Sequence, residues 1–361
     1  MDLAGLVARV GPILGFVVGI TVVAELASGI GVFTMVARGA ARLAHGSVLR
    51  LWLLVVLVAV VATTVLSLDT TAVLLTPVVL ALAAQLALDR AVFALTAVWL
   101  ANTASLLLPV SNLTNLLAVG RLPGYDAARF AALTWPAALA GVLVTVAVLA
   151  LLFRRSLRGR YTLGSAAPVA DRRLLVLATS VCALLGPSFL MGVDVFLASA
   201  VAAGILVMAC AFARPSLLSW RLLPWRLVLG VSVLFVGVQY AHDHGLGALL
   251  GAAAGSGESW PALLRMTGLA ALGANVVDNL PTYLALEPTA DASPLRLAAL
   301  LVGVNAGPLL TPWASLATLL WAARCRAAGV AVSWGRFALR GLLLVPLLLV
   351  AAVTALRLVH R

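Results

Sequence analysis

Apolar runs about as long as a bilayer is thick recur along the whole chain, and they limit the fold more than any other feature. A helix needs about 20 apolar residues to cross the hydrocarbon core. Hydrophobic residues make up 63% of the 361 residues and charged residues only 10%, which leaves too little polar surface for a water-soluble protein of this size. The sequence therefore predicts an all-α polytopic membrane protein. The runs lie at 10–36, 48–66, 68–86, 91–119, 130–153, 174–191, 194–212, 226–241, 262–289, 294–323 and 337–356.

The charge distribution predicts the orientation and location of the chain. The net charge is +12, and every basic residue is Arg. These Arg residues gather between the apolar runs, above all in 154–173, which is the positive-inside pattern rather than a surface for nucleic acid. We therefore expect a multi-pass protein of the cell (inner) membrane, in contact with the lipid bilayer and with no nucleic-acid partner. Segment 154–173 is expected to be cytoplasmic and both termini outside, and 10–36 is expected to be a true span rather than a removed signal.

The two halves of the chain share a pattern. Both contain N-x6-P-x2-[NS]-L-x-[NT]-L-L, beginning at Asn102 and at Asn305, with a constant offset between the matched residues. Ordered matches of Asn, Pro and a polar pair arise by chance less readily than matches of Leu. The pattern predicts a first membrane repeat at 1–153, a linker at 154–173 and a second membrane repeat at 174–361. Because the Arg pattern starts the repeats on opposite sides, they are predicted to be inverted, as in many transporters.

Two apolar stretches are predicted to be re-entrant hairpins. Segment 48–86 carries the polar group SLDTT near its middle, and 262–289 carries NVVDN. The predicted tips are residues 67–71 and the neighbourhood of Asp278. For 48–86, two full spans are the alternative reading.

Prolines inside the repeated pattern predict broken helices. Pro109 and Pro312 each remove an amide donor and clash with the preceding turn. The backbone groups freed by a break must be satisfied by protein, water or a bound solute, and polar side chains cluster at both prolines. Such side chains also hold helices together without binding anything, which is the alternative reading. The predicted substrate-binding residues are Asn102, Thr103, Ser105, Ser111, Asn112, Asn115, Asn279, Asn305, Thr311, Ser315 and Thr318.

Three acids lie within apolar runs and are predicted to couple transport to an ion. An intramembrane carboxylate is costly and is by default a functional hypothesis. Asp69 and Asp278 fall at matching places in the two predicted hairpins, where they would carry protons or coordinate sodium. A protonated, hydrogen-bonded structural acid is the alternative. Glu25 is assigned to the same set, although Gln239 stands at its partner position and a structural role is equally open.

No metal, cofactor or catalytic motif stands out. His242 and His244 have no third ligand nearby in the sequence, and Cys182, Cys210 and Cys325 are too far apart for a CxxC site or a disulfide framework. The sequence carries no P-loop. We therefore expect no cofactor, no metal site and no enzyme activity. The alternative from another class is an intramembrane aspartyl enzyme with Asp69 and Asp278 as its dyad.

Four segments together resemble the ArsB-type arsenite permeases of the ion-transporter superfamily, which also holds the NhaD antiporters and the divalent-anion/sodium symporters. They are LDTTAVLLTPVVLA (68–81), ANTASLLLPVSNLTNLL (101–117), DNLPTYLA (278–285) and VNAGPLLTPWASLATLLW (304–321). The resemblance implies an inverted-repeat carrier that exports arsenite or antimonite in exchange for protons. It also implies a homodimer and, as in some members, a soluble ATPase partner.

The chain departs from that family at both hairpins. Leu68-Asp69-Thr70 stands where the family has Asn-Asp-Gly, and Asp278-Asn279 stands where it has two Asn residues. The extra acid leaves open a sodium- or proton-coupled carrier of another small anion, or of sodium, in the same fold.

Overall fold

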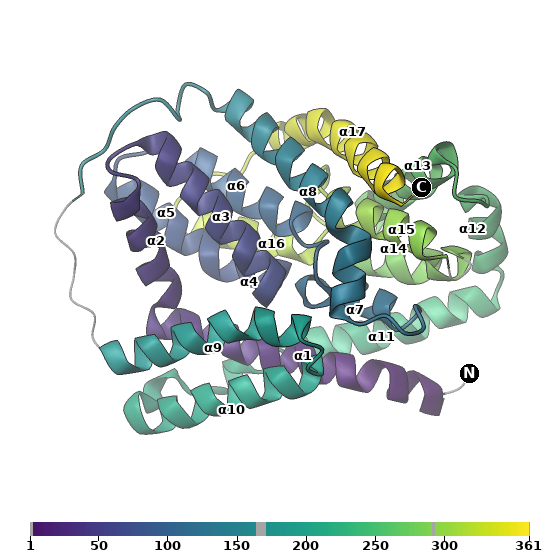
Figure 1. The fold of residues 1–361 in the computed structure, drawn as a ribbon, viewed down its shortest axis with the longest axis horizontal. Coiled ribbons are helices and arrows are strands. Elements are labelled where there is room, and N and C mark those ends of the chain that lie inside the picture. Colours follow the sequence, from purple (N-terminus) through teal and green to yellow (C-terminus); the bar gives the residue numbers. More distant parts are fainter. Residues whose placement is uncertain (1–2, 164–170, 291–292, 361) are drawn as a thin grey trace.

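Helices build the whole of the described chain, which in this computed structural model covers residues 3–163, 171–290 and 293–360 (Figure 1). Within these ranges the only pairing of extended backbone is an isolated bridge between Ser47 and Arg160. The first part comprises α1 (Leu3–Ile30), α2 (Val32–Leu43), α3 (Val48–Leu66), α4 (Leu68–Thr70), the π-helical turn η1 (Thr71–Leu75), α5 (Thr76–Gln85), α6 (Arg90–Thr103), η2 (Pro109–Ser111), α7 (Leu113–Val119) and α8 (Ala127–Leu152). The second comprises α9 (Arg172–Leu190), α10 (Val195–Ala213), η3 (Pro215–Leu217), η4 (Trp220–Leu222), α11 (Trp225–Asp243), α12 (Leu246–Ala254), α13 (Trp260–Val276), α14 (Asn279–Leu286), η5 (Glu287–Ala290), α15 (Pro294–Ala306), α16 (Leu316–Ala327) and α17 (Trp334–Val359).

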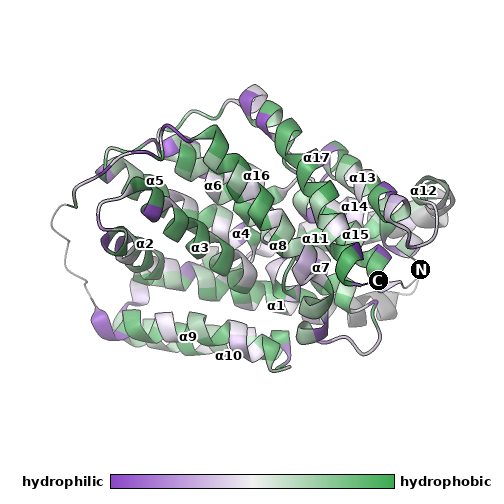
Figure 2. Ribbon diagram, turned by 45° about the horizontal axis from the view of Figure 1, so that its top comes forward, coloured by the Kyte–Doolittle hydropathy of each residue, from purple (hydrophilic) through white to green (hydrophobic). Residues whose placement is uncertain are grey.

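The helices have the lengths and surfaces of membrane spans. Among the described residues, seven helices are long and apolar enough to cross a bilayer. Large apolar side chains such as Leu143 and Leu343 remain exposed on them, as a lipid-facing surface requires. Figure 2 shows apolar residues covering the helices, with strongly polar residues gathered mainly in the connecting segments and at helix ends. The prediction of an all-α polytopic membrane protein is confirmed.

The run at 10–36 is two helices rather than one. Gly31 separates α1 from α2 and adopts a left-handed conformation with φ 105°. A side chain at this φ is strained, so glycine is the residue that allows the chain to turn here. Together with α9 and α10, α1 forms a layer along the lower edge of Figure 1.

Segment 48–86 turns back on itself at Ser67. Both of its ends lie beside the segment that follows α8: Ser47 pairs with Arg160, and the Ser156 hydroxyl donates to Asp89 at 2.8 Å. At the tip, Ser67 has φ 103° and its hydroxyl accepts the Thr70 amide. The tip packs against η2, where the Ser111 hydroxyl donates to the Thr64 carbonyl at 2.9 Å. The segment is therefore a hairpin whose tip meets the turn at Pro109.

Helices α13 and α14 form a second turn-back, with Asp278 at its tip. Asp278 has φ 139°, and its carboxylate accepts the Leu280 amide at 3.1 Å. Helix α13 packs closely along α15 through glycine. A Cβ added at Gly303 would lie within 2.5 Å of the Ala270 Cβ, so only glycine permits this approach.

Helical structure is interrupted near Pro109 and near Pro312, where the sequence predicted breaks. Helix α6 ends at Thr103, and the chain resumes helical structure as η2 at Pro109 and then as α7. Helix α15 ends at Ala306 and α16 begins at Leu316, with Pro312 between them. The start of α1 and the end of α17 lie at one end of the molecule (Figure 1). The end of α8 and the start of α9 lie towards the opposite end.

Candidate functional site

An amide and hydroxyl cluster joins the two halves of the chain at the broken helices. The Asn305 Oδ1 accepts from the Asn112 Nδ2 at 2.7 Å and from the Thr114 hydroxyl at 2.9 Å. The Asn305 Nδ2 donates to the Asn115 Oδ1 at 2.7 Å. All four residues are buried. Asn305 on α15 is thus held by three hydrogen bonds from α7 and its cap, and a buried network of this kind fixes one arrangement of the helices.

The turn between α6 and α7 satisfies its own backbone. The Asn115 Nδ2 donates to the carbonyls of Ser105 and Leu108, at 2.6 and 3.0 Å. The Ser111 hydroxyl accepts the Leu108 amide, and the Ser105 hydroxyl donates to the Asn102 carbonyl. Because a bilayer offers no water to these groups, each would otherwise be an unpaired polar atom.

The turn between α15 and α16 is supported from the second hairpin by Asn275. Its Oδ1 accepts the amides of Leu310 and Thr311, both at 3.1 Å, and its Nδ2 donates to the Gly307 carbonyl at 2.8 Å. The Asn275 carbonyl accepts from the Thr311 hydroxyl and the Trp313 indole. Asn275 was not among the predicted site residues. The signal available in the sequence was an Asn three residues before Asp278, in NVVDN.

Several buried polar atoms at the breaks lack a hydrogen-bond partner among the described residues. They include the Asn102 Oδ1 and the hydroxyls of Thr103, Ser315 and Thr318. Ser315 precedes α16 yet does not cap it, and α16 packs against α4 and η1 of the first hairpin. Unpartnered buried hydroxyls are costly, and a bound ion or solute is one way to satisfy them.

The two hairpin acids, Asp69 and Asp278, occupy different positions on their turns. Asp278 is the tip residue itself, whereas in the first hairpin the tip residue is Ser67 and Asp69 follows it inside α4. The structural counterpart of Asp278 is therefore Ser67, two residues before the acid that the sequence pattern suggested.

The remaining predicted residues lie around this cluster or apart from it. Asn279 is buried as the first residue of α14. Glu25 lies on α1 and forms no hydrogen bond with the Asn305 cluster among the described residues. Of the two histidines, His244 contacts the Tyr240 carbonyl, while the side chain of His242 lies outside the described structure.

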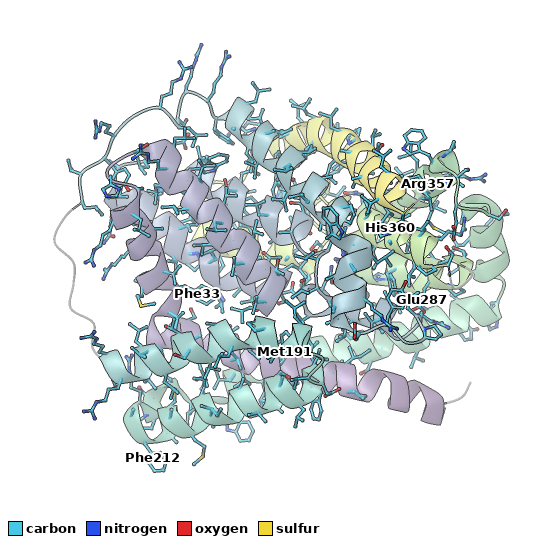
Figure 3. The ribbon with its side chains drawn as sticks, viewed as in Figure 1. Phe33, Met191, Phe212, Glu287, Arg357 and His360 are labelled. Carbon is cyan, nitrogen blue, oxygen red and sulfur yellow. The ribbon has the colours of Figure 1, made fainter. Side chains whose placement is uncertain are left out.

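An ion pair links the two halves at the end that holds the termini. The Arg121 Nη2 lies 2.9 Å from the Glu287 Oε2, and the Tyr283 hydroxyl donates to the other carboxylate oxygen at 2.8 Å. Figure 3 places Glu287 beside the end of α7. The hydrogen bond that Arg121 donates to Glu287 raises the pKa of the Arg121 guanidinium above its ordinary value. Neither residue was singled out in the sequence.

Soft-metal chemistry has little support in the described part of the chain. No group of three His, Cys, Asp or Glu residues there could hold a metal ion. Cys182, Cys210 and Cys325 are free and sit on three different helices. A solute at the breaks would therefore meet amides, hydroxyls, carbonyls and carboxyls.

Comparison with known proteins identifies the family. The model of the CitMHS family, described as citrate transporter, matches residues 6–318. An arsenical pump membrane protein of Escherichia coli is 28% identical, over 94% of this chain and 85% of the relative. One from Yersinia enterocolitica is also 28% identical over the same shares.

A further relative, the 46 kDa membrane protein of Mycobacterium leprae, is 26% identical over 86% of this chain and 78% of its own length. The relatives and the family model are named for transport or for the membrane, and none of these is named as an enzyme. The resemblance to ArsB-type permeases seen in the sequence is confirmed. The chain belongs to the CitMHS citrate transporter family and is a multi-pass membrane transporter.

Proposed function

We propose that this transporter exports arsenite or antimonite from the cell in exchange for protons. The observation that carries the proposal is the packing of α16 against α4, the hairpin segment that contains Asp69, at the end of α16 where the buried hydroxyls of Ser315 and Thr318 have no partner among the described residues. The names of the arsenical pump relatives supply the solute class.

The polar groups at the breaks suit this solute. Arsenite is a neutral trihydroxide near pH 7, so its hydroxyl groups can both donate and accept hydrogen bonds. Asn102 offers a free side-chain oxygen, and Thr103, Ser315 and Thr318 offer free hydroxyls. In this proposal those side chains, with Ser105, Ser111, Asn112, Asn115, Asn279, Asn305 and Thr311 around them, bind the solute or shape its site.

Coupling follows from a differential affinity. If solute binds best when Asp69 and Asp278 are deprotonated, then proton uptake releases solute on one side and proton loss restores affinity on the other. Glu25 is proposed to assist proton movement along α1. The repeats 1–153 and 174–361 would rock against each other as inverted halves, with 154–173 cytoplasmic, both termini outside, and the protein in the inner membrane as a homodimer. A soluble ATPase partner is proposed as an optional source of energy.

The test is arsenite uptake into everted vesicles that contain the full-length protein, with and without an imposed pH gradient. We expect gradient-driven uptake that Asp278→Asn and Asp69→Asn each reduce to background. The matched control is Asp194→Asn, an exposed helix cap that Asn serves equally well, and its uptake should equal that of the unmodified protein. Gradient-independent uptake, or full uptake by Asp278→Asn, would contradict proton coupling through this acid.

A second candidate rests on the family model, whose description is citrate transporter. In it, the same fold carries another small anion, or sodium, coupled to protons or sodium. Citrate and sodium flux in the same vesicles separates the two proposals. Flux of citrate or sodium without arsenite uptake would keep the transporter and replace the solute.

A further inference from the structure

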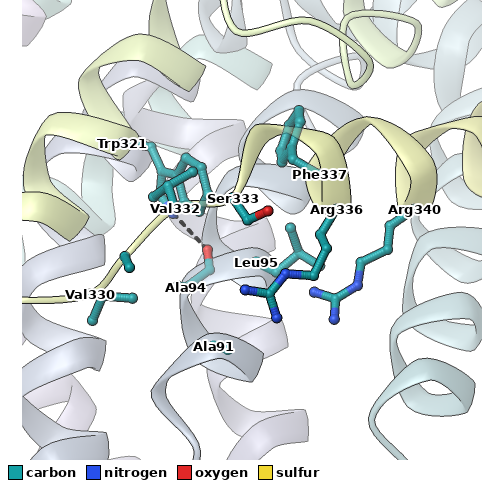
Figure 4. A pocket seen from close by; sticks show the side chains of 11 residues that line it. Ala91, Ala94, Leu95, Trp321, Val330, Val332, Ser333, Arg336, Phe337 and Arg340 are labelled. Carbon is teal, nitrogen blue, oxygen red and sulfur yellow. Dashed lines mark hydrogen bonds between the residues drawn. The ribbon is translucent and has the colours of Figure 1, made fainter.

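A pocket away from the helix breaks opens between α6, α16 and the start of α17 (Figure 4). Its volume is about 110 Å³, several times the ~30 Å³ that a water molecule occupies in the liquid. Its wall is formed by Ala91, Ala94, Leu95, Trp321, Val330, Ala331, Val332, Ser333, Arg336, Phe337 and Arg340. None of these residues belongs to the predicted solute site.

Two arginines give the pocket its charge. Arg336 and Arg340 lie one turn apart on α17, and Figure 4 shows their guanidinium groups side by side below the helix. The residues that line the pocket include no acid. Among the described residues neither guanidinium forms an ion pair; Arg340 instead lies 5.0 Å from the centre of the Phe153 ring. Like charges at this spacing repel, so the pair is more stable with an anion between them.

The backbone adds to this positive field. Ser333 precedes α17 without capping it through its side chain, and it lines the pocket together with Arg336. A helix N-terminus favours negative charge. Tetrahedral anions such as phosphate match the forked donors of Arg.

The surroundings of the pocket indicate where such an anion comes from. Trp334 packs edge to face against Trp321 and against Phe337, Trp321 and Phe337 lie against each other at a tilt, and the Trp321 indole donates to the Ala94 carbonyl. Further along α17, Leu339 and Leu343 are exposed as on a lipid-facing helix. Tryptophan gathers at the level of lipid headgroups, and the pocket adjoins the first turns of α17, a helix long and apolar enough to cross a bilayer.

We propose that Arg336, Arg340 and Ser333 bind the phosphate group of an anionic phospholipid headgroup. Basic pockets between membrane helices are suited to such headgroups. The chains of the lipid would lie along the exposed leucines of α17, while the phosphate bridges α17 to the connection that leads from α16. The bound lipid would thereby fix the loop 328–333, and the proposal is independent of the solute that is carried.

The test is a titration of purified full-length protein in a neutral detergent with phosphatidylglycerol, followed by the thermal unfolding midpoint. We expect a saturable rise of the midpoint with phosphatidylglycerol and little with phosphatidylcholine. Replacing both arginines, Arg336→Gln with Arg340→Gln, should raise the half-saturating lipid concentration at least about tenfold, because each basic group near an anionic lipid contributes roughly fivefold. Arg336→Gln alone should give an intermediate shift.

The matched control is Arg42→Gln with Arg50→Gln, two exposed arginines of α2 and α3 that do not line the pocket. This control should keep the half-saturating concentration of the unmodified protein. Equal loss in both double variants would show that only overall charge matters and would overturn the site. If inorganic phosphate at the same concentrations gave the same protection and competed with phosphatidylglycerol, the ligand would be a free anion and the headgroup assignment would be overturned.

Discussion

The two helix breaks carry similar prolines but are stabilised in different ways. The break after α6 is closed by its own residues, since Asn115, Ser111 and Ser105 satisfy backbone groups within the same turn. The break after α15 depends on the neighbouring hairpin, where Asn275 accepts two of its amides and donates to a third residue. The backbone of the first turn is satisfied mainly by its own side chains, and that of the second turn mainly by a side chain of the neighbouring hairpin.

The difference also concerns what remains free. Asn112 caps α7 with its side chain, whereas Ser315 at the matching position leaves α16 uncapped and its hydroxyl unpartnered among the described residues. One feature is common to both: a hydroxyl from each turn donates to the carbonyl three residues before a hairpin tip, Ser111 to Thr64 and Thr311 to Asn275. Both breaks have buried polar atoms without a partner among the described residues, Asn102 and Thr103 at the first and Ser315 and Thr318 at the second, but only the second leaves the start of its helix uncapped.

Removing Asn275 should have the largest effect on stability. Asn275→Ala leaves the buried amides of Leu310 and Thr311 without an acceptor, so we expect a loss of about 3 kcal/mol in the free energy of unfolding. Asn115→Ala should cost somewhat less, about 2 kcal/mol, because it leaves two carbonyls of its own turn and the side-chain amide of Asn305 without this partner but deprives no backbone amide of an acceptor. Unfolding in mixed detergent measures both. Equal losses would remove the distinction between the two turns.

Close packing in the second half should give the next largest effect. Gly303→Ala forces α13 and α15 apart, since its Cβ would meet the Thr267 carbonyl and Ala270, and we expect a loss of about 2 kcal/mol. Gly268 on the same α13 has nothing within 4 Å of an added Cβ. Gly268→Ala should therefore stabilise by up to about 1 kcal/mol. The same unfolding assay reports both, and a loss in the two variants alike would argue against close approach as the cause.

The ion pair between the halves should contribute less. Arg121→Gln removes the cation from Glu287, whose side chain is 3% exposed, while that of Arg121 is 48% exposed. Solvent screens the arginine, so we expect a loss of only about 1 kcal/mol. The pKa of Arg121 is raised by its hydrogen bond to Glu287, so the guanidinium stays protonated at every pH below its ordinary pKa, and the stability that depends on its charge is lost at the alkaline end only above that pKa. Arg121→Lys, which keeps the charge, should retain part of the stability.

The unpartnered hydroxyls should matter least for stability and strongly for transport. Ser315→Ala and Thr318→Val remove buried hydroxyls that have no partner, so the free energy of unfolding should stay within about 1 kcal/mol or rise. In everted vesicles the half-saturating arsenite concentration should rise about tenfold, the effect of one or two lost hydrogen bonds. Thr179→Val is the control, because its hydroxyl donates to the Leu175 carbonyl within α9, which belongs to neither break. Unchanged arsenite affinity in the Ser315 and Thr318 variants would assign the site elsewhere.

The helices and their breaks could be predicted from the sequence, because they follow from properties of short stretches of the chain. The apolar runs gave the helices, and Pro109 and Pro312 gave the breaks, because hydrophobic length and the missing amide act locally. The turn at Ser67 falls within the predicted tip at 67–71, but the matching of Asp69 with Asp278 was not reproduced, because the residue at the position of Asp278 in the first hairpin is Ser67.

Two kinds of residue escaped prediction for a physical reason. Asn275 and Thr114 resemble any polar residue of a membrane helix, and their roles arise from partners 35 and 191 positions away. Arg121 and Glu287 likewise meet across 166 positions, a pairing that no short motif encodes. The sequence pattern therefore identified where polar chemistry gathers, while the pairing within it required the three-dimensional arrangement.

The short length of the broken helices has a consequence for how the protein is made. Helix α6 has 14 residues and α15 has 13, so at about 1.5 Å per residue each covers only about two thirds of a ~30 Å hydrocarbon core. Neither can settle in a bilayer alone with its last carbonyls unpaired. During synthesis, α6 can therefore take its final place only after α7 has been made. Asn305 on α15 then forms hydrogen bonds with Asn112 and Asn115, which were synthesised about 190 residues earlier. Completion of this membrane protein is thus a late event of biogenesis, reached only when nearly the whole chain has been inserted.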